Sequence, residues 1–225
     1  GRSPVLAPHG MASTSSPLST QAAVSVLQKG GNALDAAIAA SAVQAVVEPQ
    51  STSIGGDCFC LYSQAGNDRV IAMNGSGRAP MGLSADWLLR QGITKIEQQS
   101  PHSVTVPTAI DAWIKLNRDY GKTPLGELLQ PAIGYARDGF PIGHRVAADF
   151  ADCHDLLAGD ADIASVYLKN GKDFQYGDLC RNPNLAKALD AIAEHGRDGF
   201  YKGWVADDIL SKLQSLGGVH TQDDL

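Results

Sequence analysis

The amino-acid sequence predicts an α+β protein, in which several helices accompany an antiparallel pair of strands. Two observations support this prediction. The segment Ala33–Val47 has Asp35 as its only charge and shows no clear polar face, as in a buried helix about 22 Å long. Residues 59–63 and 70–74 are strand-like runs that flank a turn-rich connection, residues 64–69, and this arrangement is typical of a β-hairpin.

The helix predicted over Ala33–Val47 has clear signals at both ends. Gly30 and Gly31 precede it, and either glycine can adopt a positive φ that ends the helix before it. Asn32 is a favourable N-cap, and Asp35 stands three residues later, where its carboxylate can reach back to the N-cap N–H. Pro49 ends the helix, because the residue before a proline disfavours helical geometry.

Further elements follow from apolar spacing and capping residues. We expect a helix from Ser19 or Thr20 to Lys29, a helix capped by Ser84 that ends at Arg90, and a short strand over Val104–Val106. Additional helices are predicted over residues 109–120, capped by Thr108, and over 124–137, 147–158, 184–195 and 204–216. Nothing in the sequence marks a domain boundary, so residues 1–225 are expected to belong to one domain.

Composition excludes several classes of function. The 225 residues are 44% hydrophobic and 19% charged, which is typical of a globular protein, and the net charge of −6 offers no basic surface for a nucleic acid. Neither a membrane helix nor an apolar signal-peptide core is predicted, and no metal or cofactor motif is found.

Cys58 and Cys60 alternate with apolar neighbours and are interpreted as small packing residues. Four scattered, reduced cysteines favour the cytoplasm, with the periplasm as the alternative.

The last residues carry a second helix signal. Thr221 and Asp224 have the spacing of a capping box, yet only Leu225 follows. A single helical turn is unstable by itself, because its nucleation costs more than one hydrogen bond returns. We therefore expect the chain to have been cut from a longer one.

Several sequence blocks resemble the γ-glutamyltranspeptidase family. The blocks GGNALDAAIAASAVQAVVEP (30–49) and SIGGDCF (53–59) are similar to the start of its members, and HSVTVPTAIDAW, PLGELLQPAIGYARDGFPI and the terminal GGVHTQDDL resemble later blocks in the same order. The resemblance implies the αββα sandwich of N-terminal nucleophile hydrolases, with this chain as the large subunit. It also implies self-cleavage of one precursor, with the catalytic threonine heading a small partner subunit. No catalytic residue is then expected in this chain, and no cofactor or metal.

One expected substrate site lies in this chain. Transpeptidases have a segment of the form D-G/F-R-E-x-A-P, whose arginine holds the α-carboxylate of the glutamyl group. Counting back from Ala79-Pro80, Ser76 occupies the arginine position and Gly77 the glutamate position, while Arg78 follows two places later. A guanidinium pairs naturally with a carboxylate, so Arg78 is the first candidate for binding substrate, and Ser76 is the second. The alternatives are a surface salt bridge for Arg78 and a plain turn for Ser76. The glycines on both sides of Ser76 are expected to let the backbone approach another surface closely.

The displaced arginine leads to the predicted function. We expect hydrolysis of a small amide that bears a carboxylate, such as oxamate, as in the oxamate amidohydrolase branch of the family. The alternatives are a γ-glutamyltranspeptidase or glutathione hydrolase, and a non-catalytic scaffold of the same fold. The expected partners are the small subunit and the amide substrate, with assembly into a dimer of heterodimers. Without its partner, the all-apolar helix over Ala33–Val47 is expected to lose its cover, which would make the chain insoluble or molten.

Overall fold

The computed structural model describes residues 3–225, which fold as two compact units. The first unit contains the residues through Ser53 together with Asn117–Ala193. The second unit contains Ile54–Leu116 and Glu194–Leu225. The structure therefore divides the chain in two by its contacts, although the sequence carries no boundary signal.

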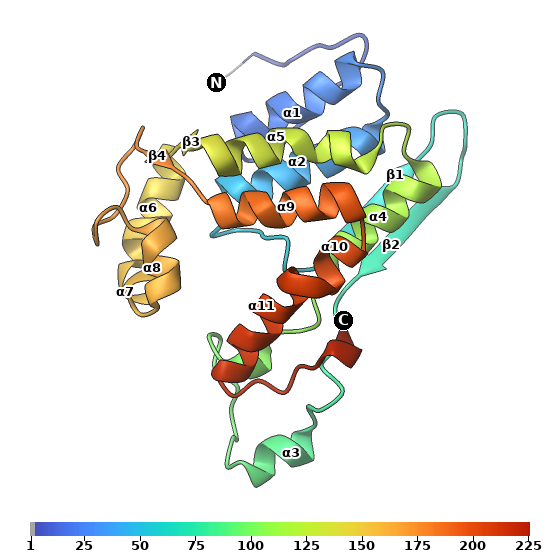
Figure 1. Cartoon of the computed structure of the whole chain (residues 1–225). Coiled ribbons are helices and arrows are strands. Elements are labelled where there is room, and N and C mark those ends of the chain that lie inside the picture. Colours follow the sequence, from blue (N-terminus) through green and yellow to red (C-terminus); the bar gives the residue numbers. More distant parts are fainter. Residues whose placement is uncertain (1–2) are drawn as a thin grey trace. The chain divides into compact units, whose positions relative to one another are not determined.

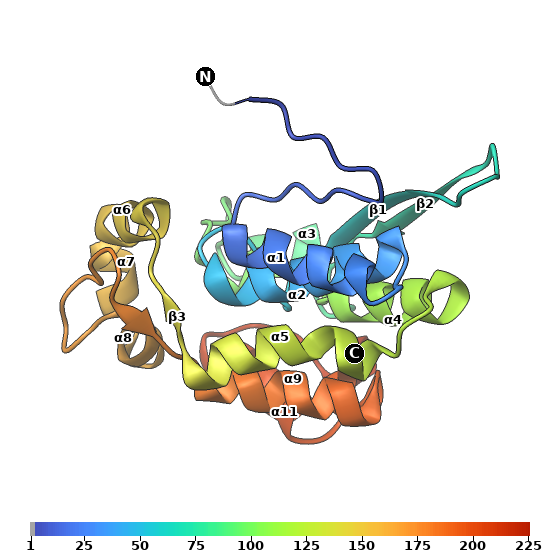
Figure 2. The same cartoon turned by 90° about the horizontal axis from the view of Figure 1, so that it is seen from above.

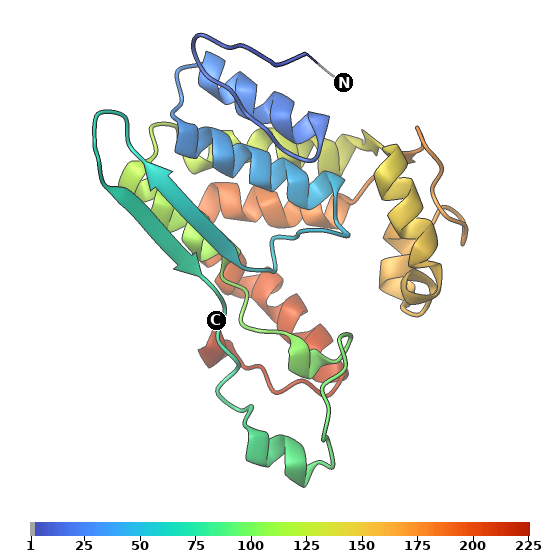
Figure 3. The same ribbon diagram turned by 180° about the vertical axis from the view of Figure 1, so that it is seen from behind.

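The elements of the first unit are mainly helices. They are α1 (Pro17–Gln28), α2 (Ala33–Val47), α5 (Leu125–Asp138), β3 (Phe140–Pro141), α6 (His144–Asp152), α7 (His154–Ala158), α8 (Ala161–Tyr167), β4 (Leu179–Cys180) and most of α9 (Pro183–His195). Figure 1 shows α1, α2 and α5 side by side, and Figures 2 and 3 show the same neighbours from above and from behind. The short strands β3 and β4 pair antiparallel.

The second unit contains the longer hairpin. Its elements are β1 (Cys58–Ser63), β2 (Val70–Gly75), α3 (Ala85–Arg90), the 3₁₀ turn η1 (Pro101–Ser103), most of α4 (Ala109–Tyr120), α10 (Asp198–Tyr201), α11 (Gly203–Ser215) and the 3₁₀ turn η2 (Gln222–Asp224). Strands β1 and β2 pair antiparallel, with Phe59 opposite Asn74 and Leu61 opposite Ala72. The predicted hairpin is therefore confirmed.

Helix α2 has the predicted bounds and the predicted cap. The Asn32 side chain accepts a hydrogen bond from Asp35 N–H at 2.9 Å, and Asp35 Oδ2 accepts one from Asn32 N–H at 3.0 Å. Gly30 has a φ of +93°, as expected for the end of α1. Asp35 also accepts the Lys122 N–H on both carboxylate oxygens at 3.1 Å, so it connects α2 to the segment before α5. The capping acid is thus a long-range contact as well.

The prediction that α2 lacks cover within this chain is wrong. Eleven of its fifteen residues are buried, because α1 and α5 pack along it. An exposed apolar surface lies on the hairpin, where Phe59, Leu61 and Val70 project from one face with exposures of 70%, 79% and 62%. Cys58 and Cys60 lie on the opposite, half-buried face, and burial raises the pKa of both thiols. We call the face with Phe59, Leu61 and Val70 the hairpin face.

Some element boundaries differ from the prediction. Helix α1 begins at Pro17, because a proline at the first helical position needs no N–H partner and has a helical φ. The segment Val104–Val106 is not a strand, since its Val106 N–H makes a single backbone hydrogen bond, to the Arg78 carbonyl. The helix predicted over residues 147–158 begins earlier and breaks at Cys153 into α6 and α7. Helix α8, capped by Asp160, was not predicted.

Two further findings concern the described residues. None of the helices within residues 3–225 has the length and apolar character that a membrane span requires. The same residues contain no cluster of three or more His, Cys, Asp or Glu side chains arranged to hold a metal ion.

Replacing Asp35 should destabilise the fold strongly. Asp35→Ala removes the acceptor of the Asn32 and Lys122 N–H groups, and we expect a loss of about 3 kcal/mol in the free energy of unfolding, measured by urea titration. The control is Asp86→Ala, which changes an exposed acid in the first turn of α3 and should cost less than about 0.5 kcal/mol. Equal losses for the two variants would contradict this role of Asp35.

Candidate functional site

The candidate site begins at the bend that follows β2. At Gly77 an added Cβ would lie 2.0 Å from the Val106 carbonyl oxygen, so only glycine fits there without a backbone shift. The Val106 N–H donates to the Arg78 carbonyl at 2.9 Å, and the Thr108 hydroxyl donates to the Gly75 carbonyl at 2.5 Å. The close approach expected of the glycines around Ser76 is therefore confirmed, and residues 106–108 are the surface that the bend meets.

Asp57 and Asn74 shape the bend from its other side. The Asp57 carboxylate accepts the Gly77 N–H at 2.9 Å, and the Asn74 side chain accepts the Ser76 N–H at 3.0 Å. Ser76 is exposed, and within residues 3–225 its hydroxyl has no hydrogen-bond partner. No base within residues 3–225 therefore forms a hydrogen bond with the Ser76 hydroxyl to activate it as a nucleophile. Its proposed contact with substrate stays a prediction.

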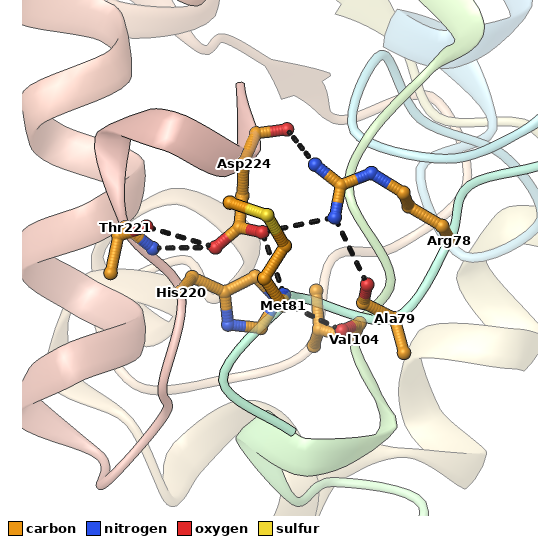
Figure 4. Close-up of polar contacts among 7 residues, drawn as sticks. All are labelled: Arg78, Ala79, Met81, Val104, His220, Thr221 and Asp224. Atoms are coloured by element: carbon orange, nitrogen blue, oxygen red, sulfur yellow. Dashed lines mark hydrogen bonds and ion pairs between the residues drawn. The ribbon is translucent and has the colours of Figure 1, made fainter. Parts of the chain in front are cut away.

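Arg78 emerges from the bend and pairs with the end of the chain. Its Nη1 donates to Asp224 Oδ1 at 3.1 Å and to the Ala79 carbonyl at 3.4 Å, while its Nη2 donates to the Asp224 carbonyl at 3.4 Å (Figure 4). The side chain remains 51% exposed, and within residues 3–225 its Nε has no hydrogen-bond partner. The alternative predicted for Arg78, a salt bridge beside the bend, is present. The exposed part of the guanidinium is still available to a ligand.

Asp224 is the buried partner of this salt bridge. Its side chain is fully buried and accepts the Met81 N–H at 2.8 Å, the Thr221 N–H at 2.9 Å and the Thr221 hydroxyl at 3.1 Å (Figure 4). Burial raises the pKa of Asp224, but these hydrogen bonds and the Arg78 guanidinium outweigh that effect and lower it below the usual value. The carboxylate is therefore held ionised.

The turn that contains Asp224 is stable for a reason that the sequence did not reveal. The capping box of Thr221 and Asp224 is confirmed, but it closes a single 3₁₀ turn, η2. Tertiary contacts hold this turn: Asp224 contacts Arg78 and Met81, and Arg197 Nη2 donates to the Leu225 carbonyl at 2.8 Å. The helix-nucleation cost therefore does not apply to it.

His220 lies beside this turn and has a structural role. It is 1% exposed, and its Nε2 donates to the Val104 carbonyl at 2.9 Å (Figure 4). Because a carbonyl only accepts, this bond places the proton on Nε2 and leaves Nδ1 bare. The Nδ1 atom is buried with no partner within residues 3–225.

A solved structure shares the fold of this chain. The crystal structure of Helicobacter pylori γ-glutamyltranspeptidase superimposes on this chain with a TM-score of 0.92 at 30% identity, over 98% of this chain and 64% of that one. The chain therefore has the α+β fold of the N-terminal nucleophile hydrolases. The sequence profile described as Gamma-glutamyltranspeptidase matches residues 19–225, and the chain belongs to that family.

Two curated relatives indicate the range of activities in the family. The chain is 37% identical to the Glutathione hydrolase-like YwrD proenzyme of Bacillus subtilis, over 98% of this chain and 40% of that protein. It is 34% identical to the Oxamate amidohydrolase proenzyme of Klebsiella pneumoniae, over 96% of this chain and 42% of that protein. The chain thus spans about two fifths of the length of these relatives.

The stability contributed by Asp224 should depend on pH. Because its folded-state pKa lies below the ordinary value of 3.8, the ionised group stabilises the fold above that pH and loses its effect as pH falls through the folded-state pKa. We expect Asp224→Asn to lower the free energy of unfolding by about 1–3 kcal/mol at pH 7, and by much less at the lowest pH at which the protein stays folded. Urea titrations across this pH range measure the difference.

The matched control for Asp224 is its exposed neighbour. Asp223→Asn makes the same change in charge one residue away and should alter stability by less than about 0.5 kcal/mol at either pH. A difference between Asp224→Asn and the parent protein that stays constant with pH would rule out the ionised carboxylate as its source.

Proposed function

We propose that the complete protein is a self-processing amide hydrolase whose substrate is a small amide with a carboxylate, such as oxamate. The observation that carries this proposal is the position of Arg78, which stands two residues beyond the place where transpeptidases have their glutamate-binding arginine. The similarity to an oxamate amidohydrolase proenzyme supports the proposal. The similarity to glutathione hydrolase and γ-glutamyltranspeptidase proteins supports γ-glutamyl hydrolysis or transfer as the second candidate.

The proposed reaction divides the chemistry between two chains. The N-terminal threonine of the partner chain attacks the amide carbon, and its own α-amine accepts the hydroxyl proton. The C–N bond then breaks, ammonia leaves with that proton, and an ester joins the acyl group to the threonine oxygen. Water hydrolyses the ester and releases the acid. This chain contributes the recognition of the substrate carboxylate.

Arg78 is suited to that recognition by the way in which it is held. Asp224 and the Ala79 carbonyl bind one side of the guanidinium through Nη1 and Nη2, which fixes its orientation. The side chain is 51% exposed and Nε has no hydrogen-bond partner within residues 3–225, so Nε can donate to a second carboxylate. Because the guanidinium is already ordered, less conformational entropy is lost when the substrate binds.

Two assays on the complete, processed protein discriminate between the candidates. We expect ammonia release from oxamate to exceed chromophore release from a γ-glutamyl anilide. Arg78→Gln should raise the KM for oxamate about 10- to 100-fold, since a charge-assisted hydrogen bond contributes about 1.5–3 kcal/mol, while Arg78→Lys should keep part of the binding.

The control for Arg78 is Arg137→Gln, which removes an exposed arginine from an ion pair with Asp138 and should leave the KM unchanged. Strong activity on the anilide alone would reverse the order of the two candidates. An unchanged KM in Arg78→Gln would remove Arg78 from the substrate site.

The hairpin face supports the proposal of a partner chain. Its exposed residues Phe59, Leu61 and Val70 form an apolar surface, and the relatives of this chain are proenzymes of more than twice its length. We propose that the small subunit released from the same precursor covers this face. A dimer of such heterodimers and a cytoplasmic location, with the periplasm as the alternative, stay predictions.

A charge on the hairpin face should impair assembly. We expect Leu61→Glu to reduce the recovery of the two-chain complex at least about fivefold in size-exclusion chromatography, because burial of an unpaired carboxylate is costly. Leu216→Glu, at an exposed leucine outside the hairpin, should have no such effect. Equal recovery of the two variants would contradict the assignment of this face.

N-terminal sequencing of the second chain distinguishes an enzyme from a non-catalytic scaffold. A threonine at its N-terminus supports catalysis, and another residue or an uncleaved precursor supports the scaffold.

A further inference from the structure

A buried acid at the end of α2 has no role in the proposed reaction. Glu48 is 8% exposed and is the C-cap residue of α2. The C-terminal end of a helix carries a partial negative charge, so it disfavours a carboxylate. Burial of a carboxylate is unfavourable as well, unless a cation or several donors compensate it. Glu48 therefore needs a compensating partner.

The contacts of Glu48 within residues 3–225 do not supply a cation. Its Oε2 accepts a hydrogen bond from the Ser15 hydroxyl, and Gln44 Nε2 donates to the Ser15 oxygen at 2.8 Å. These donors are neutral. Arg145 lines the same region, but its Nε donates to both Asp149 oxygens, at 2.8 and 3.0 Å, and its side chain is 84% exposed. Glu48 thus has no positive counterpart among the described residues.

Glu48 borders a cavity of about 470 Å³ that is formed within the first unit. Leu18, Val47 and Ile142 give the cavity an apolar lining. His144 and Tyr176 form one wall, where their rings stack with centroids 3.7 Å apart and planes 3° apart. The volume lies within the range of small-molecule sites.

We propose that this cavity binds the ammonium group of a small organic amine. The Glu48 carboxylate would pair with the ammonium, and the Tyr176 ring and the apolar lining would contact the body of the amine. A metal ion is a poor match, because hard cations need several oxygen ligands and Glu48 is the one carboxylate among the described residues that line the cavity. The cavity's lining residues in this chain all belong to the first unit. This proposal does not depend on the proposed hydrolase activity.

Calorimetric titration of the complete, processed protein with benzylamine tests the proposal. Benzyl alcohol is the neutral control of similar shape. We expect benzylamine to bind at least about tenfold more tightly than the alcohol, which is the least that a buried charge-assisted pair should contribute. Glu48→Gln keeps the acceptor for Ser15 but removes the charge, and it should weaken benzylamine binding at least about tenfold.

Two further variants complete the test. Glu127→Gln removes an exposed acid that borders a different cavity of the same unit and should leave benzylamine binding unchanged. Tyr176→Leu removes an aromatic ring that is 64% exposed, so the fold should tolerate it, and it should weaken binding about threefold through the lost cation–π contact. Equal binding of amine and alcohol, no binding of either, or an unchanged affinity in both Glu48→Gln and Tyr176→Leu would overturn the proposal.

Discussion

Each unit of this chain is fixed by one buried carboxylate that accepts backbone N–H groups from two separate segments. In the first unit, Asp35 accepts from Asn32 within its own helix cap and from Lys122, which is 87 residues away. In the second unit, Asp224 accepts from Thr221 within its own turn and from Met81, 143 residues away. Backbone N–H groups are rigid donors, so each carboxylate fixes the position of the segments that donate to it. The same hydrogen bonds offset the free-energy cost of burying the carboxylate.

Glu48 differs from Asp35 and Asp224 in the donors that contact its carboxylate. It is one of three buried acids within residues 3–225, yet its donor is a hydroxyl and it stands at the unfavourable end of a helix. Asp35 and Asp224 show how this protein satisfies a buried acid, which is with backbone N–H donors from two separate segments. The contrast is the physical reason to look for an external cation at Glu48.

The sequence predicted local features well and long-range contacts poorly. The bounds and cap of α2, the hairpin and the capping box of η2 all depend on residues a few positions apart, so their signals are present in the sequence itself. The contacts from Asp35 to Lys122 and from Asp224 to Arg78 have no such signal in the sequence. The capping role of each acid in its own helix or turn already accounts for its presence at that position. For the same reason, the glycines around Ser76 predicted a close approach without indicating that Val106 was the partner.

The two predicted roles of Arg78 are compatible once the energetics of its ion pair are considered. A half-exposed ion pair contributes at most about 1 kcal/mol to stability, and Asp224 is already satisfied by the N–H groups of Met81 and Thr221. Asp224 thus gains little from Arg78, whereas Arg78 gains a fixed orientation from Asp224. Within a family whose fold serves several substrates, specificity depends on such local groups. Identities of 37% and 34% to proteins named for different substrates do not separate the two proposed activities, so the proposal of a small carboxylate-bearing amide depends on the position of Arg78.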